Sequence, residues 1–287
     1  MVDWVENGVW HKADGTSVRV GVPAGSDQAA RFVAFGENLL AQQWSLGGPS
    51  SDDAVWLVAA DGSKKKSVVG DRFVRGPEGS VLWPERATIQ RIDPDGRRTT
   101  FSLPASAAQG GVTEMAATRN AVFLTDRNTV TRYTINGAKL TDPVVIPGAT
   151  TIVLGDPDSD QVVVANADDC TATLPAPTSS PPRWDCRYRT TAVSPDGRWG
   201  YAADGNRERA VLVGSDGQPR LILKHAKAEG AAVGHHASVV LVASKSGDVS
   251  NRSALVECTA EGRCHRISDI VEILYNSGDR PLEIVQR

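Results

Sequence analysis

The sequence predicts an all-β protein built from a repeat of about 40 residues, and three observations support this prediction. An apolar hairpin recurs along the chain at nearly constant spacing. A second, more polar hairpin recurs between the copies of the first. Long helix-forming runs are few, whereas glycine is frequent, with 27 residues among 287. Short strands joined by tight turns therefore explain the chain better than helices do.

In the first class of hairpin, two apolar strands flank a polar tip. One copy runs from Val33 to Phe35, turns at Glu37 and returns from Leu39 to Ala41. Successive tips are separated by 41, 41, 40, 38, 39 and 42 residues. This unbroken period favours a single domain over residues 1–287 and disfavours a division into two domains. The seven tips lie at Glu37, Glu78, Arg119, Ser159, Gly197, His236 and Gly278.

The second class of hairpin has Asp-Gly or Asn-Gly at most of its tips. These dipeptides are strong hairpin signals, because both central residues can adopt positive φ. One member is an excursion between two cysteines, and another has Glu-Gly. The seven tips are Asp14-Gly15, Asp61-Gly62, Asp95-Gly96, Asn136-Gly137, the Cys170–Cys186 excursion, Asp216-Gly217 and Glu261-Gly262.

Two alternating hairpins per repeat predict a four-stranded antiparallel blade, with strands A and B inside and strands C and D outside. Seven such repeats predict a seven-bladed β-propeller. The chain begins with a C–D hairpin (Val9–Val22) and ends with an A–B hairpin (Asp269–Val285). We therefore expect the last blade to take two strands from each end of the chain, which leaves no open sheet edge.

The four cysteines fall at two of the polar hairpins. Cys258 and Cys264 flank the Glu-Gly turn, where facing positions lie near disulfide distance. Cys170 and Cys186 flank an elongated, proline-rich hairpin tip, Thr171–Asp185. We expect two local disulfides. A zinc site lacks the usual C-x-x-C spacing, and free buried thiols are the remaining alternative.

Disulfides of this kind favour an oxidising compartment outside the cytoplasm. Residues Met1–Gly8 contain neither the basic nor the apolar segment of a secretory signal. No stretch approaches the roughly 18–20 apolar residues of a membrane span. We therefore expect a secreted or membrane-anchored extracytoplasmic protein from which a signal or anchor has been removed.

The net charge of −3 arises from 31 basic and 34 acidic residues that are interspersed along the chain. The basic stripe of a nucleic-acid-binding protein is absent, so we expect no nucleic-acid partner. We expect a monomer without a cofactor or a bound metal, which binds a protein or a component of the cell envelope.

One repeat carries a recognisable motif. Ser194-Pro195-Asp196-Gly197-Arg198 lies between two apolar segments and resembles the turn between strands A and B in WD40-like (PD40, TolB-type) propellers. The whole chain also resembles extracytoplasmic propeller domains of actinobacterial membrane-anchored proteins, in which C-x(5)-C hairpins recur. The resemblance implies a propeller fold. It does not carry over the translocation role of TolB, because no α/β domain precedes the repeats.

Other residues of chemical interest have structural explanations. Asp156, Asp158 and Asp160 alternate as at the start of a calcium loop, but Gln161 and Ala167 stand where an EF-hand needs glycine and glutamate. Since this segment falls on an A–B tip, turn chemistry explains it better. The five histidines lack the spacing of metal ligands, and we expect the tryptophans to pack between blades. The histidines are His11, His225, His235, His236 and His265.

The predicted loops between strands B and C repeatedly hold an acidic residue followed by arginine. The topology places these loops on one face, beside the D–A loops and around the channel mouth. They could be solvated pairs worth less than about 1 kcal/mol each. Alternatively, they form a charged ring that recognises a partner, since loops on a rigid scaffold often carry function. The candidate residues are Glu85, Arg86, Asp126, Arg127, Arg207, Arg209 and Arg252.

These observations favour a non-catalytic binding or sensing domain that engages a protein or envelope ligand through the B–C/D–A face. No nucleophile elbow or phosphate-binding loop occurs in the sequence. The alternative is a propeller enzyme, such as a lactonase, lyase or hydrolase, whose scattered axial residues no local motif reveals. A His/Asp/Glu cluster at the axial mouth would favour the enzyme.

Overall fold

In the computed structural model, the chain forms two compact units, which we describe separately. Unit 1 contains residues 1–71 and 206–287, and unit 2 contains residues 72–205. The structure describes all residues except 1–2, 22–27, 46–53, 71, 104–111, 177–180, 195, 197, 205–208, 215, 225–230, 234–237, 247–249, 260, 275–281 and 285–287.

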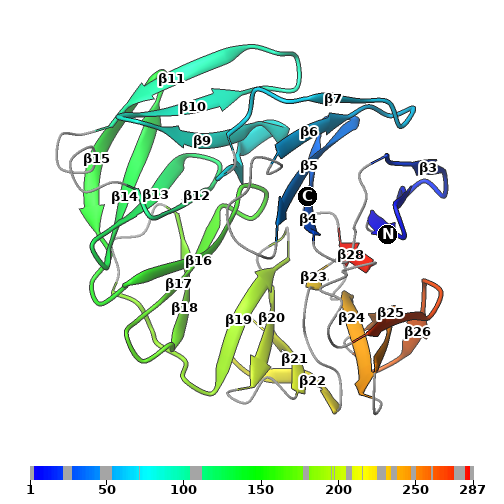
Figure 1. Cartoon of the computed structure of the whole chain (residues 1–287). Helices are drawn as coiled ribbons and strands as arrows, with labels where there is room; N and C mark the ends of the chain where they lie inside the picture. Colours follow the sequence, from blue (N-terminus) through cyan, green and yellow to red (C-terminus); the bar gives the residue numbers. More distant parts are fainter. Residues whose placement is uncertain are drawn as a thin grey trace. The chain divides into compact units, whose positions relative to one another are not determined.

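The described part of unit 2 contains three antiparallel sheets and one further hairpin (Figure 1). Within each sheet, strands that are consecutive along the chain are neighbours. The first sheet contains β8 (Val74–Arg75), β9 (Val81–Glu85), β10 (Thr88–Ile92) and β11 (Arg98–Ser102), with the 3-10 turn η1 (Pro77–Gly79) between β8 and β9. The second contains β12 (Glu114–Ala117), β13 (Ala121–Asp126), β14 (Thr129–Asn136) and β15 (Lys139–Val145). The third contains β16 (Thr151–Asp156), β17 (Gln161–Ala165) and β18 (Thr171–Pro175), and the hairpin is β19 (Tyr188–Val193) with β20 (Trp199–Asp204).

The described part of unit 1 likewise contains three antiparallel sheets and one hairpin. One sheet has the order β28-β1-β2-β3, with β1 (Trp4–Glu6), β2 (Val9–His11), β3 (Ser17–Arg19) and β28 (Leu282–Ile284). The next contains β4 (Gln28–Phe35), β5 (Asn38–Ser45), β6 (Ala54–Val58) and β7 (Lys64–Lys66). The hairpin is β21 (Arg209–Gly214) with β22 (Pro219–Lys224). The third sheet contains β23 (Ala231–Val233), β24 (Val239–Ser246), β25 (Ser250–Cys258), β26 (Cys264–Arg266) and β27 (Val271–Leu274).

Six of the seven predicted A–B hairpins are confirmed as β4–β5, β8–β9, β12–β13, β16–β17, β19–β20 and β23–β24. In β12–β13, for example, Met115 pairs with Leu124 and Ala117 pairs with Val122, so apolar residues face each other across the tip. Six sheets each lie within one unit of the described chain, and the hairpins β19–β20 and β21–β22 belong to different units. The predicted count of seven blades is therefore not confirmed.

The predicted closure by two strands from each end of the chain was wrong. β27 pairs with β25, with Val271 opposite Ser253, and does not form a hairpin with β28. β28 pairs with β1, with Glu283 opposite Val5. This sheet therefore contains three strands from the N-terminal part of the chain and one from the C-terminal part.

The extra N-terminal strand has a clear signal in the sequence. Asn7 and Gly8 join β1 to β2 with φ values of 48° and 74°. Two successive residues with positive φ define a type I′ turn, which Asn-Gly favours. The prediction of a chain that opens with a C–D hairpin overlooked this turn, because it used Asn-Gly only at C–D tips.

The position of β27 also has a local cause, which is a bulge in the outer strand of its sheet. β26 and β27 both run antiparallel to β25, and residues 267–270 separate them. At this bulge, the Ser268 side chain replaces a backbone partner of β25. Its Oγ accepts a hydrogen bond from Leu255 N (2.9 Å) and donates one to Asp269 O (2.8 Å). β27 therefore continues the outer strand beyond a bulge instead of starting a new hairpin.

The polar C–D hairpins are confirmed at β2–β3, β6–β7, β10–β11, β14–β15, β21–β22 and β25–β26. Their Asp-Gly tips differ from the predicted geometry, since only the glycine has positive φ, as in Gly96 at 89°. Asp95 instead accepts a hydrogen bond from Arg97 N (2.9 Å), while Gly96 N donates to Asp93 O (2.9 Å). These are hairpins with a glycine bulge, closed by an aspartate side chain.

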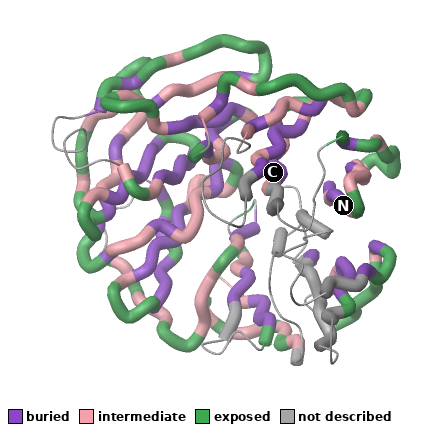
Figure 2. The backbone as a smooth tube through the Cα atoms, viewed as in Figure 1, coloured by how far each residue is buried: buried purple, intermediate pink, exposed green. Residues whose placement is uncertain are grey.

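Apolar clusters lie between consecutive sheets of each unit. Figure 2 marks the buried segments of the backbone in purple. In unit 1, Trp10 and Val20 pack against Phe32 and Leu39 of the β4–β7 sheet. In unit 2, one cluster joins the first sheet to the second, and another joins the second to the third. Trp184 packs against the latter, so the prediction that tryptophans pack between sheets is confirmed for Trp10 and Trp184.

A matched pair of glycine substitutions tests the contact between the first two sheets of unit 1. Gly62 and Gly96 have φ values of 87° and 89°, but only at Gly62 would a Cβ meet neighbours, at 2.4 Å from Arg19 O and 2.7 Å from Val18 Cγ1. Gly96→Ala should lower the free energy of unfolding by about 1 kcal/mol through its backbone conformation. Gly62→Ala should lower it by roughly 1–3 kcal/mol more through the clash. Urea titrations measure both, and equal losses would contradict this packing of β3 against the tip.

Candidate functional site

The antiparallel order gives every sheet two different ends. Strands A and B meet at a tip at one end, as do strands C and D, and we call this the tip end. The B–C turn and the connections from strand D to the next strand A lie at the other end, which we call the B–C end. The predicted site belongs to the B–C end, so the positions of its residues can be checked sheet by sheet.

In unit 2, two of the predicted arginines lie on tight B–C turns. Arg86 and Ala87 join β9 to β10, and Arg127 and Asn128 join β13 to β14. Arg86 has φ of 53°, and Arg127 and Asn128 have φ of 45° and 65°. The second turn is therefore of type I′. Arginine is uncommon in this left-handed region, where Asn and Gly are favoured.

Both arginines are exposed, and their nearby acids bind them weakly or not at all. Arg127 Nε lies 4.0 Å from Asp126 Oδ1, and the arginine side chain is 81% exposed. Arg86 and Glu85 are exposed and form no ion pair with each other in the described structure. Asp126 Oδ1 is buried without a hydrogen-bond donor among the described residues. These turns therefore present two cationic groups to solvent, beside a carboxylate oxygen that is buried.

The remaining predicted arginines belong to unit 1. Arg209 is the first residue of β21 and belongs to unit 1. Arg252 lies inside β25, opposite Lys245 of β24, and not in the B–C loop as predicted. The β24–β25 ladder extends to Ser246 and Asn251, so the loop is shorter than the sequence indicated. Arg207 lies outside the described residues.

Glu114 holds two sheets of unit 2 together at the B–C end. Its Oε2 accepts hydrogen bonds from Thr125 Oγ1 (3.1 Å) and from Ile152 N (2.8 Å). These donors come from β13 of the same sheet and β16 of the following sheet. Hydrogen bonds to a charged acceptor such as this carboxylate are stronger than hydrogen bonds between neutral groups. The carboxylate thus fixes the backbone beside the exposed turns.

The disulfide Cys170–Cys186 lies at the same end of unit 2. Cys170 ends the loop between β17 and β18, and Cys186 precedes β19. The predicted hairpin tip, Thr171–Asp185, returns to pair its two terminal residues. The bridge therefore closes the base of this excursion and ties a B–C loop to the start of the next strand A.

Sequence reasoning missed two arginines next to this bridge. Arg187 Nη2 lies 3.3 Å from Asp185 Oδ2, and Arg189 forms an ion pair with Asp169. Asp185 raises the pKa of Arg187 through its hydrogen bond and its charge, so this guanidinium stays protonated. The signal was present, because arginines follow Cys186 at alternate positions. It was overlooked because the segment was assigned to a hairpin tip at the opposite end of the sheet.

The second disulfide, Cys258–Cys264, lies at the tip end of the β23–β26 sheet, where the two residues are paired across β25 and β26. The described residues include no free cysteine. The prediction of two local disulfides is confirmed.

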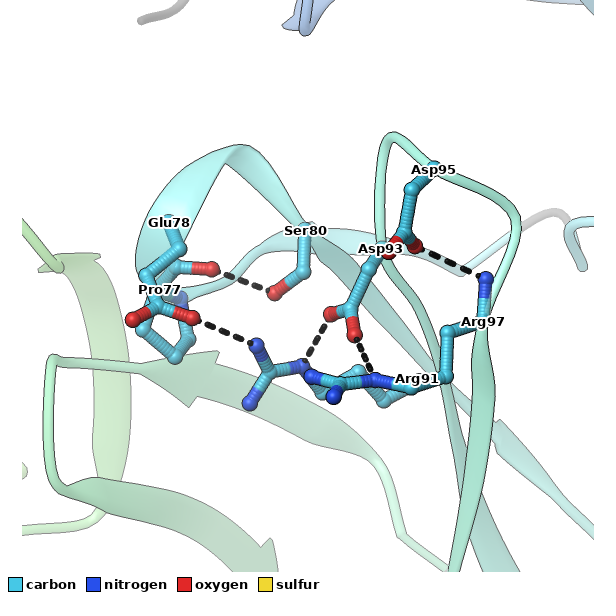
Figure 3. A network of polar contacts seen from close by, with 7 residues as sticks. All are labelled: Pro77, Glu78, Ser80, Arg91, Asp93, Asp95 and Arg97. Atoms are coloured by element: carbon cyan, nitrogen blue, oxygen red, sulfur yellow. Dashed lines mark hydrogen bonds and ion pairs between the residues drawn. The ribbon is translucent and has the colours of Figure 1, made fainter.

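At the tip end of unit 2, several charges are paired internally. Figure 3 shows Arg91 between two tips, with its Nε 2.7 Å from Asp93 Oδ1 and its Nη2 3.4 Å from Glu78 Oε2. Arg97 Nε donates to the other oxygen of Asp93 (2.9 Å). Asp93 is buried, so these contacts compensate a carboxylate that has left water.

The aspartates that resemble a calcium loop form another such network. Asp156 accepts hydrogen bonds from Asp158 N (3.1 Å) and Ser159 Oγ (2.8 Å), and Arg75 of the first sheet lies 3.4 Å away. Arg75 also binds Asp158 at 2.6 Å. Burial raises the pKa of Asp156 despite these favourable contacts. The segment is thus a turn that links sheets, as the sequence favoured.

The described histidines have local partners. His11 stacks on Trp4 with ring centroids 4.8 Å apart, and His265 Nε2 lies 3.5 Å from Glu257. His225, His235 and His236 lie outside the described residues. Among the residues that are described, no three His, Cys, Asp or Glu side chains gather closely enough to hold a metal ion. No helix in that part of the chain is long and apolar enough to cross a membrane.

No family model and no curated protein matches the sequence. Solved structures do match the fold. Apo AztD from Citrobacter koseri has a TM-score of 0.55 and 13% identity, and the match covers 99% of this chain and 98% of that one. A quinoprotein alcohol dehydrogenase-like protein from Bacteroides thetaiotaomicron has a TM-score of 0.54 and 12% identity, with coverages of 96% and 78%. The chain is a β-propeller.

Four of the six sheets described above are four-stranded antiparallel blades, whereas the β16–β18 sheet has three strands and the β23–β27 sheet has five. A chain from a mitotic checkpoint complex is similar as well, with a TM-score of 0.55, 12% identity and coverages of 86% and 80%. At these identities the likeness concerns the fold alone. Because propellers host many functions, the residues of the propeller's own B–C end must carry the functional argument.

Removing each disulfide should destabilise the propeller by an amount that follows loop length. The bridges span 16 and 6 residues. In the chain-entropy account, C170S/C186S should cost about 3 kcal/mol and C258S/C264S about 2 kcal/mol of unfolding free energy. Urea unfolding without reductant measures both. Labelling of thiols in the oxidised native protein, or a larger loss for the shorter loop, would contradict the expectation.

The raised pKa of Asp156 predicts a specific pH dependence. A carboxyl whose pKa is higher in the folded state contributes stability below its unfolded pKa, near 3.8, and loses that contribution as the pH rises through the folded pKa. Relative to Asp156→Asn, the wild-type protein should therefore gain unfolding free energy as the pH falls from neutral towards 4. Paired denaturation curves cancel the titration of the other carboxylates. The opposite trend would mean that Arg75 outweighs burial.

Proposed function

We propose that this propeller is a non-catalytic, extracytoplasmic binding or sensing domain that engages a protein or cell-envelope ligand through its B–C end. The observation that carries the proposal is the placement of exposed Arg86 and Arg127 at positive φ on two B–C turns of one unit. Arginine costs more there than Gly or Asn would. A cost of this kind points to a role outside folding.

The surroundings of these turns support recognition of a partner. Glu114 and the Cys170–Cys186 bridge fix the backbone at this end, which limits the entropy lost on binding. Arginine is enriched among the residues that dominate interface energies, because it stacks and donates several hydrogen bonds at once.

Extracytoplasmic placement is supported by the two disulfides, which persist in oxidising compartments. We further infer membership of the WD40-like (PD40, TolB-type) propellers. Its support is the A–B turn after β19, where buried Ser194 donates to Asp196 Oδ1 (2.6 Å) and accepts from Trp199 N (3.0 Å). This pattern explains why the motif contains serine and aspartate at that spacing.

We also infer one domain of seven blades over residues 1–287. The support for this count is the spacing of the hairpin tips, which stays between 38 and 42 residues along the chain. The hairpins β19–β20 and β21–β22 are consecutive in the sequence and have the lengths of an A–B and a C–D pair. Together they account for the seventh repeat.

Replacing the two turn arginines by glycine separates binding from stability. Arg86→Gly and Arg127→Gly should leave the unfolding free energy unchanged or raise it by up to about 1 kcal/mol, because the left-handed backbone is relieved of strain. The same changes should abolish retention of ligand from cell-envelope extracts. Immobilised protein and quantitative mass spectrometry of the retained material measure the effect.

Matched controls are Arg98→Gly and Lys139→Gly, which remove exposed positive charges at the tip end of the same unit. They should leave retention intact. Equal losses at both ends would point to a general charge effect and overturn the assignment to the B–C end. Undiminished retention of ligand by the variant that combines Arg86→Gly with Arg127→Gly would overturn this assignment as well.

A further inference from the structure

The outer edges of two neighbouring sheets in unit 1 carry five cationic residues, which we call the basic edge. β3 is the outermost strand of its sheet and β7 is the outermost strand of the next. Lys12 Nζ donates to Ala60 O (3.1 Å), and Lys64 Nζ donates to Gly21 O, so the two edges lie against each other. The basic edge consists of Lys12, Arg19, Lys64, Lys65 and Lys66.

The local charge is opposite to that of the whole chain. Residues 9–21 and 54–70 contain these five cations and only two carboxylates, Asp14 and Asp61, whereas the chain as a whole carries a net charge of −3. Hydrogen bonds from Thr16 and Ser63 within their own turns lower the pKa of Asp14 and of Asp61. Among the described residues, none of the five cations forms an ion pair with a carboxylate. The excess positive charge is therefore presented to solvent.

Two of these cations are held in fixed positions. Lys12 Nζ lies 4.5 Å from the centroid of the Trp10 ring, and Lys64 Nζ lies 4.9 Å from that of Trp56. Each ammonium also has its backbone acceptor from the neighbouring sheet. Cation–π contacts and hydrogen bonds together restrict the side chains, so less entropy is lost when an anionic surface approaches.

Lysines on an edge strand often only prevent the addition of another strand. That role accounts for Lys64–Lys66 on β7 and for Arg19 on β3, which is also an edge strand, but it does not require Lys12 in the turn between β2 and β3. Val68, two residues beyond the lysines, is 60% exposed. Clustered cations next to an exposed apolar side chain are typical of protein surfaces that lie on anionic membranes.

We propose that the basic edge docks on the surface of a bilayer that contains anionic phospholipids. The lysines and Arg19 contact the lipid phosphates, and Val68 reaches the apolar boundary beneath them. This interaction is separate from ligand binding at the B–C end and does not depend on it.

The test is cosedimentation of the full chain with vesicles of phosphatidylglycerol and phosphatidylcholine, compared with vesicles of phosphatidylcholine alone. Wild-type protein should bind only the anionic vesicles, and added salt should release it, because exposed charges are screened. Lys65→Gln and Lys66→Gln should each weaken partitioning about five-fold, and the double variant correspondingly more. Both side chains are exposed, so unchanged melting curves verify folding.

Arg98→Gln and Lys139→Gln remove the same charge elsewhere and should partition like the wild type. Equal weakening by all variants, or the absence of wild-type binding, would overturn the proposal. Aggregation of the lysine variants with unchanged vesicle binding would show that the lysines only guard the edge. Binding to soluble polyphosphate without binding to vesicles would identify a phosphate polymer as the ligand and exclude the membrane. Arg86→Gly should bind vesicles normally, which separates this test from that of the B–C end.

Discussion

The packing of one blade against the next is the interaction on which the other features of this propeller depend. Each blade is a thin antiparallel sheet that can bury its apolar faces only against neighbouring blades. In unit 2, side chains such as Phe123 and Val162 meet between consecutive sheets, and in unit 1 Trp10 meets Phe32 in the same way. This demand fixes the register of every strand, because a shift by one residue would turn the apolar side chains to the other face.

Because apolar side chains fill the space between the sheets, charged side chains lie at the ends of the sheets. The two ends of unit 2 differ in how these charges are arranged. At the tip end, Asp93 and Asp156 are buried and their charges are compensated by arginines from the same or another sheet. At the B–C end, Glu114 and a disulfide hold the backbone, while Arg86 and Arg127 extend into solvent. Internal pairing is expected where charges serve the fold, and exposed cations on a fixed backbone suit a surface that meets a partner.

Local signals determined how much of the fold could be predicted. Asp-Gly tips such as Asp95-Gly96 located the C–D hairpins, because glycine and a hydrogen-bonding aspartate are needed there whatever surrounds them. The prediction of how the two ends of the chain pair was wrong, because this pairing depends on two separate local features. Asn7-Gly8 was a readable turn that was not used, whereas the bulge at Ser268 arises from a side chain that replaces a backbone partner. No periodic pattern reveals such a replacement.

The candidate site was predictable only where the chain turns within two residues. At Arg86 and Arg127 the strand lengths on both sides fix the turn, so the arginines had to lie at the B–C end. Arg252 was misplaced because the β24–β25 ladder extends beyond the apolar pattern that marks the strands, as far as Ser246 and Asn251, and polar residues at a strand end resemble a loop. Arg187 was missed because a disulfide determines which end of the sheet it reaches. The geometry of the B–C end thus depends on contacts between segments that are distant in the sequence, and a periodic pattern in one chain does not reveal such contacts.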